Sequence, residues 1–167
     1  ACQNGPKDLV QLLLDHSDKI DLNAQDEDGF TAFMRICHYG QNDVVQMLLD
    51  HSDKIELNAK TNTGLTAFMR ACQNGHKDVV RLLLDHSDKI ELNAKDDSGL
   101  TAFRFACIYR HTDVVQLLLD HSDKIELNAK DEDGFTAFMR SCHYGRKDVV
   151  QLLLDHSDKL ELNAKTN

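Results

Sequence analysis

The residues best suited to chemistry in this chain are its five cysteines, because a thiolate is both a nucleophile and a metal ligand. They recur every 35 residues, at Cys2, Cys37, Cys72, Cys107 and Cys142. No two are separated by only two residues, so the pattern of a zinc site is missing. If this spacing places them on equivalent helices stacked about 8–10 Å apart, they exceed the ~7 Å Cα limit for a disulfide. We therefore predict buried, small apolar side chains.

Histidines and acidic residues offer a second set of metal ligands. Five of the nine histidines lie in a recurring Asp-His-Ser-Asp-Lys segment, again 35 residues apart, whereas the ligands of one metal ion must converge on it. Segment 26–29, Asp-Glu-Asp-Gly, resembles part of a calcium loop. Placing Gly29 at its sixth position puts Ala24 at the first and Arg35 at the twelfth, where acids are required. Neither pattern predicts a metal site.

Catalytic motifs are also missing from the sequence. It contains no Gly-rich phosphate loop, no Ser/His/Asp set and no Cys/His nucleophile pair outside the recurring pattern. We expect a protein that is not an enzyme and uses no cofactor.

The 35-residue period organises the whole chain. Asp-His-Ser-Asp-Lys recurs around His16, His51, His86, His121 and His156. The sequence divides into a partial unit 1–25, four full units 26–60, 61–95, 96–130 and 131–165, and a tail 166–167. Because both ends fall inside a unit, we interpret the chain as one array excerpted from a longer one.

Each unit predicts a turn followed by two short helices. A threonine that can N-cap the first helix stands at the same position of each full unit, at Thr31, Thr66, Thr101 and Thr136. In unit 61–95 the first helix is expected over about residues 67–74, with Gly75 ending it, and the second over about 77–86. The second helix carries Val79, Val80 and three leucines around more than half of its circumference, so it must contact neighbours on two sides. Stacked helix pairs satisfy that requirement.

Composition narrows the classes of protein and partner. The formal net charge is −9, which argues against binding the phosphate backbone of a nucleic acid. No apolar run approaches the roughly 18 residues of a membrane span. With 41% hydrophobic and 28% charged residues and no readable targeting signal, the chain is expected to be a soluble protein of the cytosolic type, or a piece of one.

The repeated pattern resembles the ankyrin repeat. The resemblance rests on Thr66-Ala67-Phe68-Met69-Arg70-Ala71-Cys72, on the later run Gly75-His76-Lys77-Asp78-Val79-Val80-Arg81-Leu82-Leu83-Leu84, and on Leu92-Asn93-Ala94-Lys95. It recurs in register along the chain. The fold it implies is an all-α helical repeat solenoid, with a helix-turn-helix and a β-turn finger in each repeat.

Two departures from the family pattern affect structure. The family histidine that bonds to the N-cap threonine becomes Met34, Met69, Arg104 and Met139, so we expect Phe and Met packing to replace that polar contact. Each unit is also two residues longer after the second helix. That helix ends without glycine, which leaves His86 or Ser87 as its C-cap.

The resemblance implies a non-catalytic module that binds a partner protein or peptide through a concave groove, with the second helices forming the convex back. Variation among the units clusters at the turns and first helices, and unit 96–130 departs most, so we expect Arg104, Phe105, Ile108 and Tyr109 to form an exposed hot spot. The full set of expected partner-binding residues is Asp28, Phe30, Arg35, His38, Tyr39, Thr63, Leu65, Arg70, Gln73, Asn74, Ser98, Leu100, Arg104, Phe105, Ile108, Tyr109, Asp133, Phe135, Arg140, His143 and Tyr144.

Three alternatives stay open. Near-identical units also arise by recent duplication or by consensus design, and an engineered scaffold needs no native ligand. Asn58, Asn93, Asn128 and Asn163 resemble asparagines that are hydroxylated in some ankyrin repeats, although hydrogen bonding to the inter-repeat turn is the structural alternative. Finally, apolar ends of the array could stack between molecules, through the residues Cys2, Leu12, Phe138 and Leu153.

Overall fold

The computed structural model describes residues 5–162, and within that range it contains helices and turns but no strand. The first unit contributes one described helix, α1 (Gly5–Asp15). The full units contribute helix pairs: α2 (Ala32–His38) with α3 (Asn42–Asp50), α4 (Ala67–Gln73) with α5 (Lys77–Asp85), α6 (Ala102–Ile108) with α7 (Thr112–Asp120), and α8 (Ala137–His143) with α9 (Lys147–Asp155). A short 3₁₀ turn, η1 (Ser157–Lys159), follows. The all-helical repeat architecture expected from the sequence is confirmed.

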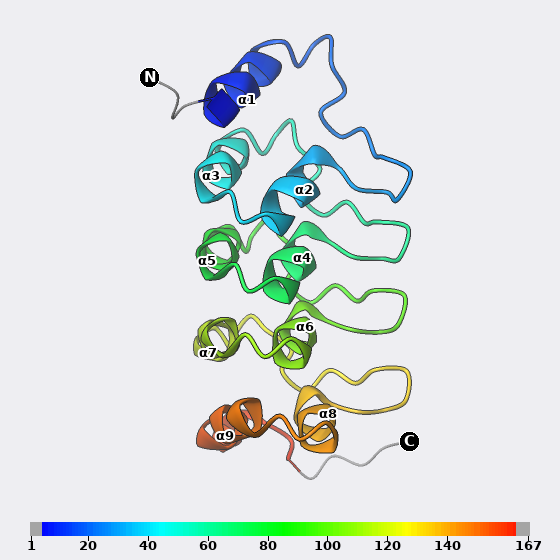
Figure 1. Ribbon diagram of the computed structural model, residues 1–167, viewed down its shortest axis with the longest axis vertical. Helices are drawn as coiled ribbons and strands as arrows, with labels where there is room; N and C mark the ends of the chain where they lie inside the picture. Colours follow the sequence, from blue (N-terminus) through cyan, green and yellow to red (C-terminus); the bar gives the residue numbers. More distant parts are fainter. Residues whose placement is uncertain (1–4, 163–167) are drawn as a thin grey trace.

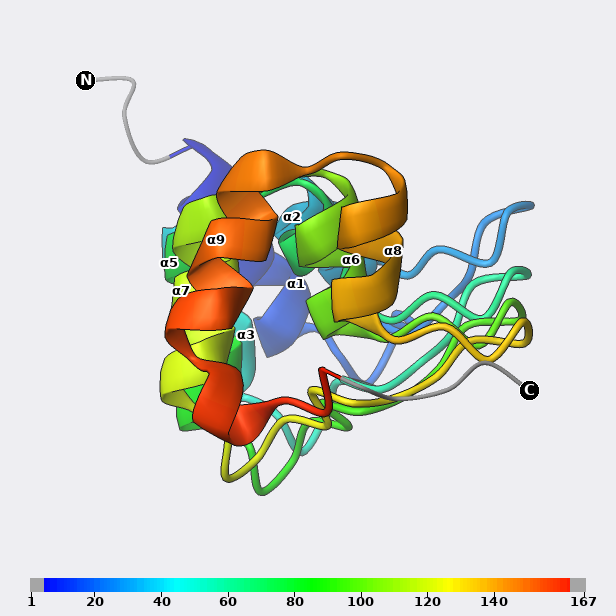
Figure 2. The ribbon, with the colours of Figure 1, turned by 90° about the horizontal axis from the view of Figure 1, so that it is seen from below.

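The helix pairs are stacked in chain order, with α1 at one end and α8 and α9 at the other (Figure 1). Seen along the stack, the second helices α3, α5, α7 and α9 form one column and the first helices form another (Figure 2). The turns that precede the first helices project from the stack as fingers on the side of the first helices. We call the surface shared by the fingers and the first helices the groove face.

The first helices begin at the expected threonines. The Thr31, Thr66 and Thr136 hydroxyls each accept from the backbone N–H three residues later, at 3.3 Å, whereas Thr101 makes no such side-chain contact. The Met69 sulfur also accepts from the Thr66 N–H at 3.4 Å. The expectation that packing alone replaces the family's polar contact is therefore wrong at this unit, because the thioether acts as a weak acceptor.

The second helices end at the histidines of the Asp-His-Ser-Asp-Lys segment. His86 is the C-cap of α5, and its Nδ1–H donates to the Leu82 carbonyl at 2.9 Å. His16, His51, His121 and His156 make the same contact in their own units. The ring thus binds one of the carbonyls that every helix C-terminus leaves unpaired, in place of the usual glycine motif.

The turn between the two helices of a pair fits against the next unit. Gly75 has φ +73°, and His111 of the next unit lies over it, donating from Nε2 to the Gln73 carbonyl at 2.9 Å. A Cβ at Gly75 would lie 2.4 Å from the His111 ring, so both the backbone angle and the neighbour require glycine. Gly40 and His76 repeat this arrangement one unit earlier. Arg110 occupies the equivalent position in unit 96–130 with φ +62°, which is strained for a residue with a side chain.

The core is the continuous apolar interior between successive pairs. Val79, Val80, Leu83 and Leu84 of α5 are at most 1% exposed, which confirms that this helix contacts neighbours on two sides. Cys37, Cys72 and Cys107 are free and buried, as predicted, but Cys142 is exposed because no described unit follows α8. Cys2 lies outside the described residues.

An asparagine ladder connects each unit to the next. Asn93 donates from Nδ2 to the Lys124 carbonyl at 2.9 Å and accepts from the Glu126 N–H at 2.8 Å. Asn23, Asn58 and Asn128 make the same pair of bonds, with the donor contact of Asn128 lengthened to 3.4 Å. The inter-repeat hydrogen bonding expected for this asparagine is confirmed there, whereas Asn163 lies outside the described residues.

The two ends of the stack expose positions that are better covered inside it. At the last unit Leu154 is 41% exposed, although the equivalent Leu84 is 1% exposed. At the first unit Leu12 is 54% exposed, whereas the equivalent Leu82 is half-buried and Leu117 is 8% exposed. Phe138 is half-buried. Leu153 is wholly buried, so its expected place on the exposed apolar edge is wrong; its neighbour Leu154 is the exposed leucine there.

Candidate functional site

The groove face carries a hollow between the last two units, of about 330 Å³. Its lining comes from the fingers and the first helices of both units. Its lining is Ser98, Leu100, Arg104, Ile108, Asp131, Glu132, Asp133, Arg140 and Tyr144. Seven of these nine residues belong to the predicted partner-binding set, and we call the hollow the groove pocket.

A buried ion-pair network lies at the base of the groove pocket. Asp131, with its side chain 6% exposed, accepts from Arg104 at 2.6 Å and from Arg140 at 2.8 Å. Arg104 also donates to the Phe135 carbonyl at 2.6 Å, and Arg140 also pairs with Asp133. The network joins α6 to the finger and the first helix of the next unit, and it fixes the guanidinium groups beneath the pocket.

The electrostatics of this network follow from its burial. Burial lowers the pKa of Arg104, and the nearby Asp131 charge counteracts part of that decrease. Burial alone would raise the pKa of Asp131. The hydrogen bonds from Phe135 N–H and Arg140, together with the charges of Arg104 and Arg140, outweigh that effect, so its pKa lies below the ordinary value. Asp131 is therefore a carboxylate at neutral pH.

A second polar cluster lies at the other end of the groove face. The guanidinium groups of Arg35 and Arg70 lie over the Phe30 ring, at 4.1 and 4.6 Å from its centroid. Arg35 also binds Asp26, and this bond, with that from Phe30 N–H, lowers the pKa of the Asp26 carboxyl. The same arrangement recurs in the last unit, where the Arg140 guanidinium lies 4.2 Å from the centroid of the Phe135 ring and binds Asp131.

A row of tyrosines lies at the C-terminal ends of the first helices. Tyr39, Tyr109 and Tyr144 occupy one repeat position, each just after a first helix, and are 64%, 51% and 56% exposed. Gln73 donates to the Tyr109 hydroxyl at 3.1 Å, which connects the row to the neighbouring unit. Exposed rings with few rotatable bonds are suited to protein contacts.

The expected exposed hot spot of unit 96–130 is only partly present. Tyr109 is exposed and Ile108 half-buried, but Phe105 is 6% and Arg104 3% exposed, so both are corrected from surface to interior residues. Arg104 is buried because it pairs with Asp131. Phe105 is buried because it has no charged group that needs water, whereas the other full units carry an arginine at its repeat position. Leu65 is also buried, at 8% exposed, and its backbone N–H donates to the Thr61 hydroxyl.

The remaining predicted residues lie on the groove face with their side chains accessible to differing degrees. Exposed are Asp28, Thr63, Ser98, Asp133 and His143; half-buried are Phe30, Arg35, His38, Arg70, Gln73, Asn74, Leu100, Phe135 and Arg140. Asp131 and Glu132 also line the groove pocket, although they were not predicted from the sequence as partner-binding residues. The signal for Asp131 was its spacing of nine residues before Arg140, which equals that of Asp26 and Arg35.

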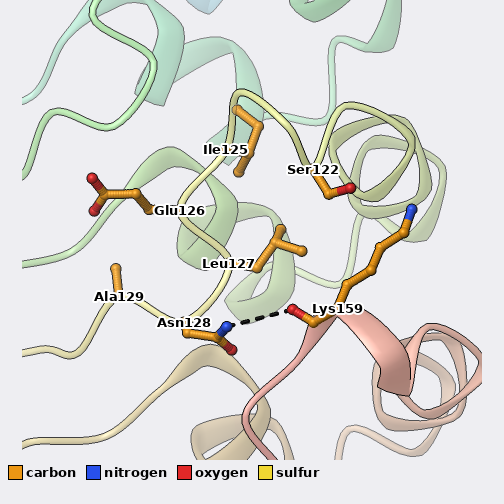
Figure 3. Close-up of a pocket in the computed structure, with 7 residues that line it drawn as sticks. All are labelled: Ser122, Ile125, Glu126, Leu127, Asn128, Ala129 and Lys159. Atoms are coloured by element: carbon orange, nitrogen blue, oxygen red, sulfur yellow. Dashed lines mark hydrogen bonds between the residues drawn. The ribbon is translucent and has the colours of Figure 1, made fainter.

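A hollow of about 550 Å³ lies between the loops that follow α7 and α9 (Figure 3). It is lined by Ser122, Ile125, Glu126, Leu127, Asn128, Ala129 and Lys159, and two of these residues, Asn128 and Lys159, are joined by the ladder bond. A hollow of about 430 Å³ with equivalent residues lies between the first two units. This crease therefore belongs to the stacking of consecutive units, and we do not assign it a site.

Within residues 5–162, no three His, Cys, Asp or Glu side chains are grouped so that they could hold a metal ion. Among the same residues, no helix has the length and apolar character needed to cross a membrane.

Comparison with known families agrees with the geometry. The family described as Ankyrin repeats (3 copies) matches residues 1–96 and 88–166. The chain belongs to the ankyrin repeat family, whose members generally mediate protein–protein interactions and are typically not catalytic. No curated protein matches the chain.

Proposed function

We propose that the groove face binds a partner protein or peptide without catalysis. The observation that carries the proposal is the groove pocket, which combines fixed charges with an exposed aromatic wall at Tyr144. Preformed concave surfaces with convergent polar groups are suited to specific recognition. Because the network around Asp131 already holds Arg140 in place, a ligand that contacts Arg140 loses less side-chain entropy on binding.

The contact residues proposed for the last two units are Ile108, Tyr109, Arg140 and Tyr144. They replace the hot spot that included Phe105, which is too buried to contact a partner. Tyrosine and arginine dominate the energetics of many protein interfaces, which agrees with this choice.

The proposal is tested by selecting peptides from a displayed library on the immobilised chain. Selected peptides should bind the double variant Tyr109→Ala/Tyr144→Ala at least tenfold more weakly. The matched control is Gln46→Ala/Gln151→Ala, which removes two polar side chains from α3 and α9 on the opposite column and should leave binding unchanged. Equal binding to wild type and to the tyrosine variant would exclude the groove face.

The second candidate is a consensus scaffold without a native ligand, which the long identical blocks of the units favour. A selection that enriches no peptide above a library control supports this second candidate over the first.

We also propose that the apolar ends stack between molecules, because Leu12 at one end and Leu154 at the other are more exposed than the equivalent residues of internal units. The mass measured by light scattering should then increase with concentration, and Leu154→Asp should suppress the increase. A wild-type chain that stays monomeric at high concentration would contradict this arrangement.

A further inference from the structure

Two arginines of the groove face each bind an aspartate of their own finger. Arg35 donates to Asp26 through Nε and Nη2, and Arg140 donates to Asp131 through the same two nitrogens. Each aspartate stands at the first position of its unit, nine residues before the arginine. The repeat therefore supplies its own carboxylate to an arginine at this position.

Arg70 occupies the same repeat position without such a partner. Its unit begins with Thr61, whereas the other three full units begin with aspartate. A hydroxyl carries no charge, and Thr61 Oγ1 accepts from the Leu65 N–H at 3.1 Å instead. Within residues 5–162, Arg70 makes no ion pair, so no carboxylate there neutralises its charge directly.

The guanidinium of Arg70 is nevertheless held in place. It lies 4.6 Å from the centroid of the Phe30 ring, and its Nη1 donates to the Gln73 amide oxygen at 2.9 Å. Its Nε is buried without an acceptor, which is destabilising for a charged group. Nη2 also has no acceptor in the described part of the chain, but it is not buried, so a group of another molecule can reach it.

The charges around Arg70 favour an anion there. Burial and the charge of Arg35, which lies over the same Phe30 ring, lower the pKa of Arg70. Asp26 is already bound to Arg35, and the exposed Asp28 of that finger forms a salt bridge with neither arginine. Arg70 is thus a positioned cation whose neighbouring carboxylate is engaged elsewhere.

Arg70 also adjoins one of the proposed contact residues. Gln73, which accepts from Arg70, donates to the Tyr109 hydroxyl at 3.1 Å, and Tyr109 is 51% exposed. A peptide advances by about 3.3–3.6 Å per residue when extended. One that packs a side chain against Tyr109 can therefore place a neighbouring side chain against Arg70.

We propose that Arg70 binds a carboxylate of the partner, so that the groove face selects peptides with an aspartate or glutamate near the residue that contacts Tyr109. The partner's carboxylate takes the role that Asp26 and Asp131 have in their own units. A carboxylate matches the planar donors of a guanidinium. This inference rests on the proposed function and adds the chemistry of the ligand.

Thr61→Asp tests the unpaired state of Arg70 without any ligand. The variant restores the residue of the other full units, and its carboxylate should bind Arg70 as Asp26 binds Arg35. The melting temperature should rise by about 2 °C or more, and the rise should disappear when Thr61→Asp is made in Arg70→Gln. No rise, or an equal rise in both backgrounds, would overturn the inference.

Peptides selected on the wild-type chain from the displayed library test the ligand. They should share an acidic residue, and replacing it with asparagine or glutamine should weaken binding at least about tenfold. Thr61→Asp and Arg70→Gln should bind the acidic peptides about tenfold more weakly and should no longer distinguish acid from amide. Arg81→Gln, which removes an exposed arginine of α5, is the matched control and should bind as the wild type does.

The outcomes separate this inference from the proposed function. Selected peptides that lose affinity for Tyr109→Ala/Tyr144→Ala but show no preference for an acid would overturn the carboxylate contact alone. A distinction between acid and amide that persists in Arg70→Gln would overturn it as well. A selection that yields no peptide dependent on the groove face would overturn both.

Discussion

Asn93→Ala tests the hydrogen bonds that connect consecutive units. The variant removes the 2.9 Å bond to the Lys124 carbonyl and the 2.8 Å bond from the Glu126 N–H. A typical bond contributes about 1 kcal/mol net, and the released groups are near solvent and can bind water. We therefore expect a loss of about 1–2 kcal/mol, which corresponds to a decrease of about 2–8 °C in melting temperature for a chain of this size.

The measurement is urea unfolding followed by circular dichroism. Asn128→Ala is the matched control, since it changes the same residue type at the same repeat position. Its donor contact is longer, at 3.4 Å, and lies at the end of the stack, so its loss should be smaller. A stability of Asn93→Ala within 0.3 kcal/mol of wild type, on the order of experimental error, or a larger loss for Asn128→Ala, would refute the role of the ladder.

Three other perturbations follow from positions with unusual environments. Phe105→Ala removes a ring that is 6% exposed and should destabilise the fold by about 3–5 kcal/mol in urea unfolding, whereas an exposed ring would give almost no change. Arg110→Gly is made in an Asp148→Ala background, so that the exposed Arg110–Asp148 ion pair is already absent. The substitution should increase the free energy of unfolding by about 1 kcal/mol, because glycine adopts φ +62° without strain. An unchanged free energy of unfolding would show that Arg110 is not strained. Burial and the positive charges of Arg70 and its neighbours lower the pKa of His38, so the unfolded chain binds the proton more readily. The stability of the folded chain should therefore decrease as the pH falls through the ordinary pKa of histidine. In His38→Gln, the urea midpoint should change less between pH 7 and pH 5 than in the wild type. An equal slope of midpoint against pH in both proteins would contradict this role of His38.

The positions of the helices could be predicted from the sequence because they depend on local signals. Threonine begins the first helix, and the run of Val and Leu in the second allows only a helix covered on two sides. These signals operate within one unit, so one unit was enough to recognise them.

The environments of individual side chains could not be predicted in the same way, because they depend on residues about one unit away. Arg104 is buried by Asp131 and Phe135 of the next unit, and the exposure of Cys142 results from the end of the stack. Because arginine is a charged residue, Arg104 was expected at the surface. Its burial depends on its ion-pair partner Asp131, which lies 27 residues later in the sequence.

The contact between a glycine turn and the histidine of the following unit limits the order in which the units can be joined. His76 and His111 leave no room for a Cβ at Gly40 and Gly75. Arg110 has a Cβ at the equivalent position, and the following unit carries Arg146 instead of histidine. A recombinant in which unit 96–130 precedes unit 61–95 would bring that Cβ against an imidazole ring. Near-identical sequences therefore do not make the units interchangeable modules, and any shuffling of them must move each turn together with the residue that covers it.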